Sequence, residues 1–146
     1  MIYTPMVKRA ILLASDAHRG QYDKGGLPYI THPLHVADQM KTEDECVVAL
    51  LHDVMEDTGL TEFNLKEWGI SDRQIAALKL LCHDESVPYL EYIQRIRIDP
   101  IATAVKIEDL KHNSDLTRLN SITQVDLERV QKYKEALRIL QTIEIG

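Results

Sequence analysis

The sequence of 146 residues has little of what marks secreted, membrane or nucleic-acid-binding proteins. Its only cysteines, Cys46 and Cys82, lie far apart in apolar helical patterns, so we expect two buried free thiols in a reducing compartment. It has no signal peptide and no apolar run of about twenty residues, so we expect a cytoplasmic protein without a membrane partner. The 17 basic residues are outnumbered by 23 acidic ones, and the net charge of −6 argues against binding to nucleic-acid polymers.

The sequence also lacks alternating strand patterns, internal repeats, low-complexity tracts and linkers. Apolar residues instead recur at helical spacing. Helix start signals appear at Thr4-Pro5, Thr42, Thr61, Ser71, Asp99-Pro100 and Thr123. We therefore predict an all-α fold, a single compact domain over residues 1–146 with about seven helices and short connections. Trp68 is expected in its core.

The stretch from Leu50 to Thr58 joins an apolar helix to a crowded acidic end. If the helix that begins at Thr42 continues to about Thr58, its three carboxylates share one face and the histidine reaches the same spot. These four residues are His52, Asp53, Glu56 and Asp57. Clustered acids at a buried helix end are costly to desolvate unless a positive group compensates, and a divalent cation is the simplest candidate.

Two distant residues could complete such a site. His32 stands at a helix start after a glycine-rich loop, and Asp109 lies in an otherwise apolar helix. Imidazole and carboxylate ligands together suit manganese, iron or zinc, and spacing leaves the choice open. His52-Asp53 taken alone is more simply a structural ion pair, and the acids that follow could be solvated, although negative charge there opposes the helix dipole.

Four ordered blocks resemble the HD phosphohydrolase superfamily, and their flanks narrow the resemblance to the hydrolase domain of RelA/SpoT-type (p)ppGpp enzymes. The blocks are residues 17–21, 24–33, 49–58 and 105–113, and residues 129–133 are similar to the last helix of that domain. The resemblance covers nearly the whole chain. It implies an all-helical, manganese-dependent HD domain that removes the 3′-pyrophosphate of (p)ppGpp, here in a stand-alone form without synthetase and regulatory domains.

The resemblance also implies a role for each matching residue. The metal ligands would be His32, His52, Asp53 and Asp109. The attacking water would be oriented and deprotonated by Glu56 and Asp57. The nucleotide pocket would be lined by Lys24, Tyr29, Asn113 and Tyr133. From the residues themselves, Lys24 could also be a solvated loop lysine, and Tyr133 on its apolar stripe fits core packing better. The other histidines are expected in surface, capping or packing roles: His18, His35, His83 and His112.

The chain departs from the family pattern at two places. Asp23-Lys24 stands where the family usually has Arg-Lys, and Ser114-Asp115 stands where a basic residue often follows the asparagine. A different nucleotide or phosphorylated metabolite is therefore an alternative substrate. A non-catalytic nucleotide sensor with the same fold is the third hypothesis.

Overall fold

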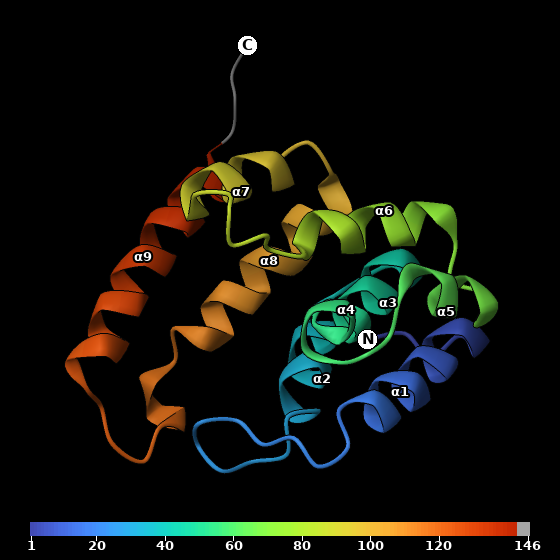
Figure 1. Cartoon of the computed structure of the whole chain (residues 1–146), viewed down its shortest axis with the longest axis horizontal. Coiled ribbons are helices and arrows are strands. Elements are labelled where there is room, and N and C mark those ends of the chain that lie inside the picture. Colours follow the sequence, from blue (N-terminus) through green and yellow to red (C-terminus); the bar gives the residue numbers. More distant parts are fainter. Residues whose placement is uncertain (143–146) are drawn as a thin grey trace.

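Helices account for nearly all regular structure in the computed structural model, which describes residues 1–142 (Figure 1), and the all-α prediction is confirmed. The helices are α1 (Pro5–Ala17), α2 (Thr31–Asp38), α3 (Glu43–Leu51), α4 (Val54–Asp57), α5 (Glu62–Glu67), α6 (Asp72–Leu81), α7 (Tyr89–Ile96), α8 (Pro100–Asn113), the 3₁₀ turn η1 (Leu116–Arg118) and α9 (Gln124–Gln141). Within residues 1–142, β-structure is limited to one isolated bridge between Tyr22 and Pro28. Four residues of the predicted domain 1–146 lie outside this description.

Helix α3 is the centre of the molecule. Every residue from Cys46 to Leu51 is fully buried, and the helix packs against α1, α2, α6 and α8. Helix α9 lies further out and packs on α7 and α8 (Figure 1). The start of α2, the end of α3 and part of α8 therefore meet inside the protein, and the predicted metal ligands lie at this meeting point.

Helix starts follow the signals in the sequence. Thr42 and Glu45 form a complete capping box at α3, and Thr123 and Asp126 form another at α9. The Asp99 side chain accepts hydrogen bonds from the first backbone amides of α8. These caps set where each helix begins and so fix the register of the residues that follow.

The predicted single helix from Thr42 to Thr58 is wrong, because the chain breaks between α3 and α4. Helix α3 ends at Leu51, and Asp53, with φ −102° and ψ −2°, precedes the short α4. The His52 side chain donates from Nδ1 to the Ala49 carbonyl oxygen at 2.5 Å, and this carbonyl would otherwise carry the helix onwards. The break turns His52 and Asp53 towards α2 and α8.

Trp68 was expected in the core, and this prediction is wrong. Trp68 follows the short helix α5 as its C-cap and is 41% exposed. Cys46 is buried as expected, Cys82 is half-buried, and both are free.

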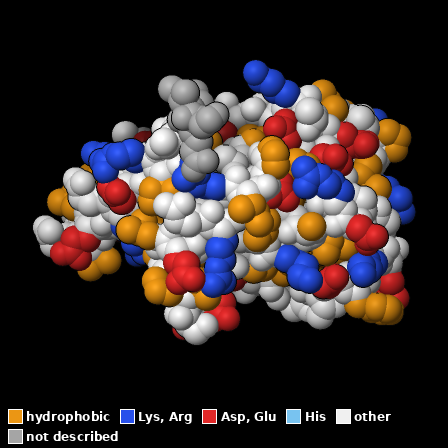
Figure 2. All heavy atoms as spheres, turned by 90° about the horizontal axis from the view of Figure 1, so that it is seen from above, with side chains coloured by type: hydrophobic (Ala, Val, Ile, Leu, Met, Phe, Trp, Pro, Cys, Tyr) orange, Lys and Arg blue, Asp and Glu red, His pale blue; other side chains and the backbone are white. Residues whose placement is uncertain are grey.

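The face of the molecule seen from above carries both signs of charge (Figure 2). Figure 2 shows Lys and Arg side chains interspersed with acidic and apolar ones over the face seen from above, without a field of one sign. Among residues 1–142, no helix has the length and apolar character that crossing a membrane requires.

The burial of α3 predicts a large stability cost for shortening its side chains. Leu50 is fully buried at the centre of the bundle. We expect Leu50→Ala to lower the free energy of unfolding by about 2–5 kcal/mol, through lost apolar contact and the cavity left behind. Urea unfolding followed by circular dichroism measures this change. Leu12→Ala on α1, where the side chain is 67% exposed, is the matched control and should change stability by less than about 0.5 kcal/mol.

Candidate functional site

Three buried side chains from separate elements meet at one point. His32 comes from the first turn of α2, His52 from the end of α3 and Asp109 from α8. One ligand atom from each lies within 4.8 Å of the others. Asp109 Oδ1 is 2.8 Å from His32 Nε2 and 3.4 Å from His52 Nε2. Three of the four predicted metal ligands therefore form a cluster of the kind that holds a divalent cation.

Asp53, the fourth predicted ligand, borders this cluster. Its Oδ2 atom lies 3.1 Å from His52 Nε2 and 3.8 Å from His32 Nε2. The Tyr29 hydroxyl donates to the same oxygen at 2.5 Å. Burial opposes ionisation of Asp53, yet His52 beside it holds its pKa below the usual value. An ionised carboxylate at this place adds negative charge to a site already rich in oxygen and nitrogen donors.

The chemistry of His52 fits a bound cation. Because Nδ1 donates to the Ala49 carbonyl, a neutral imidazole presents the lone pair of Nε2 to the two carboxylates. Nε2 is buried and has no hydrogen bond of acceptable geometry, although both carboxylates are near. The Nε2 lone pair and the two carboxylates are all hydrogen-bond acceptors, so a proton or a metal ion must lie between them. Burial disfavours the protonated ring, but Asp53 and Asp109 raise the pKa of His52 well above its ordinary value, so a metal competes with a proton here.

His112 orients His32, a contact that the sequence analysis missed. The Nδ1 atoms of the two rings are 2.7 Å apart, and the rings are stacked. Burial and the nearby Arg118 lower the pKa of His112 to about 4, so its ring is neutral and can accept a hydrogen bond. For His32 to offer Nε2 to a metal, its Nδ1 must carry the proton and donate to His112. The available signal was that His112 lies three residues after Asp109, on the same side of α8.

Asp109 is held on both of its oxygens. Lys106 donates to Oδ2 at 2.9 Å, and Asn113 donates from its side chain to Oδ1 at 3.0 Å. Burial opposes ionisation, but Lys106 and the two site histidines hold the pKa of Asp109 well below its usual range. The carboxylate is therefore charged and fixed in place before any ligand arrives.

Glu56 and Asp57 lie on α4 at the rim of the site. Glu56 Oε1 accepts from the backbone amide of His83 at 2.9 Å, and Glu56 lines a cavity of about 260 Å³ together with Asp109. The Asp57 backbone carbonyl accepts from the Gln21 side chain at 3.0 Å. Burial raises the pKa of Asp57, and the negative charges of Asp53 and Glu56 raise it further. Both acids lie beside the cluster, and their roles in activating water stay predictions.

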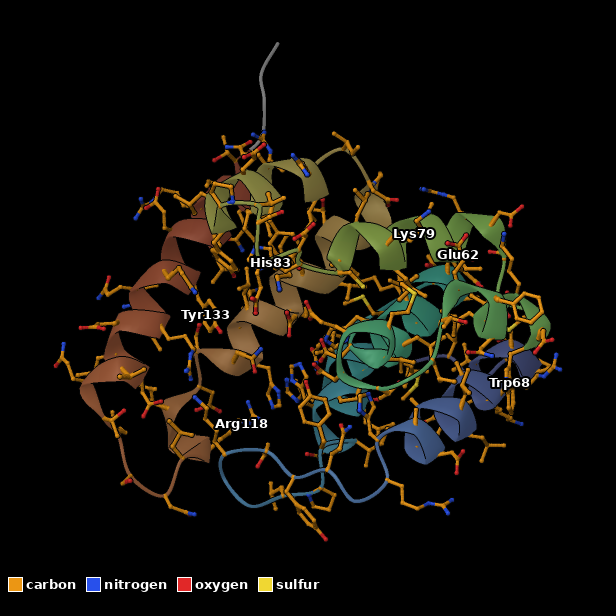
Figure 3. All side chains as sticks on the ribbon, viewed as in Figure 1. Glu62, Trp68, Lys79, His83, Arg118 and Tyr133 are labelled. Carbon is orange, nitrogen blue, oxygen red and sulfur yellow. The ribbon has the colours of Figure 1, made fainter. Side chains whose placement is uncertain are left out.

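A larger cavity of about 380 Å³ is lined by His32 and by all four predicted nucleotide-binding residues: Lys24, Tyr29, Asn113 and Tyr133. Tyr133 extends from α9 (Figure 3) and packs against the hydrophobic core, as expected, while it also lines both cavities. Lys24 is 59% exposed and lies 3.9 Å from Asp126. The structure brings these residues to one pocket, and their binding roles stay predictions.

Comparison with known sequences gives several relatives. No family model matches the chain. It is 53% identical over 60 residues to a guanosine-3′,5′-bis(diphosphate) 3′-pyrophosphohydrolase of Haemophilus influenzae, covering 38% of this chain and 9% of the relative. It is 46% identical over 65 residues to the bifunctional (p)ppGpp synthase/hydrolase SpoT of Escherichia coli, covering 42% and 9%. It is also 32% identical over 133 residues to the putative GTP diphosphokinase RSH1 of Arabidopsis thaliana, covering 73% and 15%.

The chain thus matches about a tenth of the length of the first two of these curated relatives. One solved structure, described as a metazoan ortholog of SpoT that hydrolyzes ppGpp, matches with a TM-score of 0.76 at 21% identity. The match covers 99% of this chain and 90% of the solved one, so the fold is shared along the whole described length. The chain is therefore a homologue of the RelA/SpoT-type (p)ppGpp enzymes, with the fold of a solved SpoT ortholog.

Proposed function

We propose that this protein is a manganese-dependent hydrolase that removes the 3′-pyrophosphate from ppGpp or a closely related guanosine nucleotide. One observation carries the proposal: the buried cluster of His32, His52 and Asp109, in which His52 Nε2 has no hydrogen bond. The names of the Haemophilus influenzae and Escherichia coli relatives point to the same substrate. The two free cysteines agree with the cytoplasm as the place of action.

The residues that would hold the ion are the three of the cluster together with Asp53. Bound there, a divalent ion supplies Lewis-acid polarisation of a phosphoryl oxygen and makes a nearby water more acidic. The protein contributes the fixed arrangement: Lys106 and Asn113 hold Asp109, and His112 holds His32. The mixture of imidazole and carboxylate donors suits manganese, iron or zinc. We assign manganese because the chain resembles the manganese-dependent hydrolase domain of RelA/SpoT-type enzymes.

Asp57 and Glu56 handle the attacking water in this proposal. A water oxygen attacks the phosphorus bonded to the 3′-oxygen, and the bond from that phosphorus to the 3′-oxygen breaks. The 3′-oxygen takes up a proton from solvent, and GDP and pyrophosphate leave. Asp57 takes a proton from the water, because its raised pKa makes it a better base than an ordinary surface aspartate. Glu56, anchored on the His83 amide, orients the same water.

The pocket residues bind the nucleotide. Tyr29 and Asn113 each touch a metal-ligand carboxylate while lining the 380 Å³ cavity, so they connect substrate binding to the reacting centre. Lys24 at the mouth and Tyr133 on α9 contribute the outer wall. The substrate is a small-molecule nucleotide, and the net charge of −6 argues against binding to a nucleic-acid polymer.

A second candidate is hydrolysis of a different nucleotide or phosphorylated metabolite. It is favoured by the acidic side chains in the large cavity, among them Asp23 and Asp115 at the two places where the chain departs from the family pattern. A non-catalytic sensor is the third, and it requires ligand binding without turnover.

A substrate panel separates these functions. The purified protein, loaded with Mn²⁺, is incubated with ppGpp, GTP, ATP and sugar phosphates, and the products are resolved by ion-exchange chromatography. We expect equimolar GDP and pyrophosphate from ppGpp. Orthophosphate from another compound, with ppGpp intact, would favour the second candidate, and binding of ppGpp without any product would favour the sensor.

A further inference from the structure

Arg118 ties together two segments that are far apart in the sequence. Its guanidinium donates to Asp23 Oδ2 at 3.2 Å, joining η1 to the loop between α1 and α2. It also donates to the His112 carbonyl oxygen at 3.0 Å. Figure 3 shows Arg118 beside this loop, below the end of α8. Both side chains of the pair are largely shielded, with 20% of Arg118 and 10% of Asp23 exposed.

The backbone of the loop is fitted to Arg118 as well. A Cβ atom on Gly25 would lie only 2.2 Å from the Arg118 carbonyl oxygen, so a side chain cannot be added there without moving one of the two segments. The loop itself is held by Asp23, whose Oδ1 accepts from the Leu27 amide at 2.9 Å. One wall of the 380 Å³ cavity is therefore a built structure, with Arg118 at its centre.

The charge of Arg118 is already balanced. Burial opposes ionisation of Asp23, yet the Leu27 amide and Arg118 hold its pKa below the usual value, so the pair is ionised. The other cations that line the cavity also have an acidic neighbour, since Lys24 and Arg129 lie 3.9 Å and 3.6 Å from Asp126. A balanced cation attracts a phosphate chain weakly. A guanidinium held by its edges still has a flat, weakly hydrated face that stacks well on aromatic rings.

We infer that Arg118 is a specificity-determining residue whose guanidinium face stacks on the purine base of the nucleotide. Leu116, Leu119 and Val130 line the same cavity and supply apolar surface for the base. This inference rests on the proposed function, because it names the part of the substrate that this cavity holds.

The test measures nucleotide binding without turnover. Dissociation constants for GDP, CDP and inorganic pyrophosphate are measured by calorimetry on the full chain with Mn²⁺. We expect Arg118→Ala to weaken GDP binding about 10- to 100-fold, as expected for one lost base-stacking contact. CDP binding should weaken less because its base is smaller, so the preference for GDP shrinks, and pyrophosphate binding should stay unchanged. Arg118→Lys, which keeps the charge and loses the plane, should behave like Arg118→Ala.

Two controls keep the result interpretable. Arg138→Ala on α9, where the arginine is exposed and pairs with Glu135, should leave all three constants unchanged. Thermal unfolding of each variant shows whether the fold survives, and damage to the pocket as a whole would weaken GDP and CDP equally. Full GDP affinity in Arg118→Lys, or an equal loss for pyrophosphate, would overturn the inference and indicate a phosphate contact. If Arg118→Ala loses GDP binding but the wild type does not hydrolyse ppGpp, the proposed activity alone is refuted. If the wild type hydrolyses ppGpp but Arg118→Ala binds GDP as tightly as the wild type does, the inference alone is refuted.

Discussion

Replacing Asp109 with alanine is expected to remove both the bound ion and the turnover. Asp109 Oδ1 is the atom that lies close to both site histidines, 2.8 Å from His32 and 3.4 Å from His52. A metal contributes several kcal/mol of transition-state stabilisation, so the rate should fall by about 10³-fold or more. Manganese content by mass spectrometry and ppGpp hydrolysis measure the two effects.

The same substitution leaves Lys106 buried without its partner, which costs about 3–5 kcal/mol of stability. Thermal unfolding is therefore measured alongside, and Asp109→Asn, which keeps the shape, serves as a second variant. Glu108→Ala, one position earlier on α8 and outside the cluster, is the matched control and should retain metal and activity. Wild-type turnover in a folded Asp109→Ala protein would place the reaction elsewhere.

Replacing Asp57 with asparagine is expected to lower kcat by about 10²- to 10⁴-fold, the usual effect of losing a positioned base. Metal binding should persist, because Asp57 is not one of the cluster residues. Glu56→Gln should lower kcat in the same direction. Single-turnover hydrolysis together with manganese content separates this effect from that of Asp109→Ala, and loss of the ion in Asp57→Asn would contradict the division of roles.

The raised pKa of Asp57 also predicts how Asp57→Asn changes the stability of the fold. A carboxyl group whose folded-state pKa lies above its unfolded value costs folding free energy when it is ionised. This cost grows as the pH rises through the unfolded and then the folded pKa, and it is fully present at neutral pH. Asp57→Asn should therefore be at least as stable as the wild type at pH 7, while the rise of activity with pH that belongs to Asp57 should disappear.

Much of the fold was predictable because helix starts carry local signals. Thr42 with Glu45 and Thr123 with Asp126 are capping boxes in the sequence and in the structure. The break after Leu51 was not predictable in this way, since neither glycine nor proline marks it. It depends on the His52 side chain taking the Ala49 carbonyl, a contact that the periodicity of apolar residues does not reveal.

The metal ligands of the candidate site, such as His32 and Asp109, were predictable because their residue type and their place in an ordered sequence block are enough to identify them. The groups that hold those residues were missed. His112 lies 80 residues from His32 and Arg118 lies 95 residues from Asp23, so these pairs exist only once α8 and the preceding loops are packed. The position of Trp68 was misjudged for a related reason: an aromatic residue at the end of a short surface helix has only one side to bury.

The most direct test of the central claim follows ppGpp hydrolysis by one protein preparation before and after its metal is removed with a chelator. We expect GDP and pyrophosphate in equal amounts from the loaded protein, no turnover after chelation, and recovery when Mn²⁺ is returned. His52→Ala, treated in the same way, should not recover. Undiminished hydrolysis by the chelated protein, or recovery in His52→Ala, would contradict a catalytic metal held by this cluster.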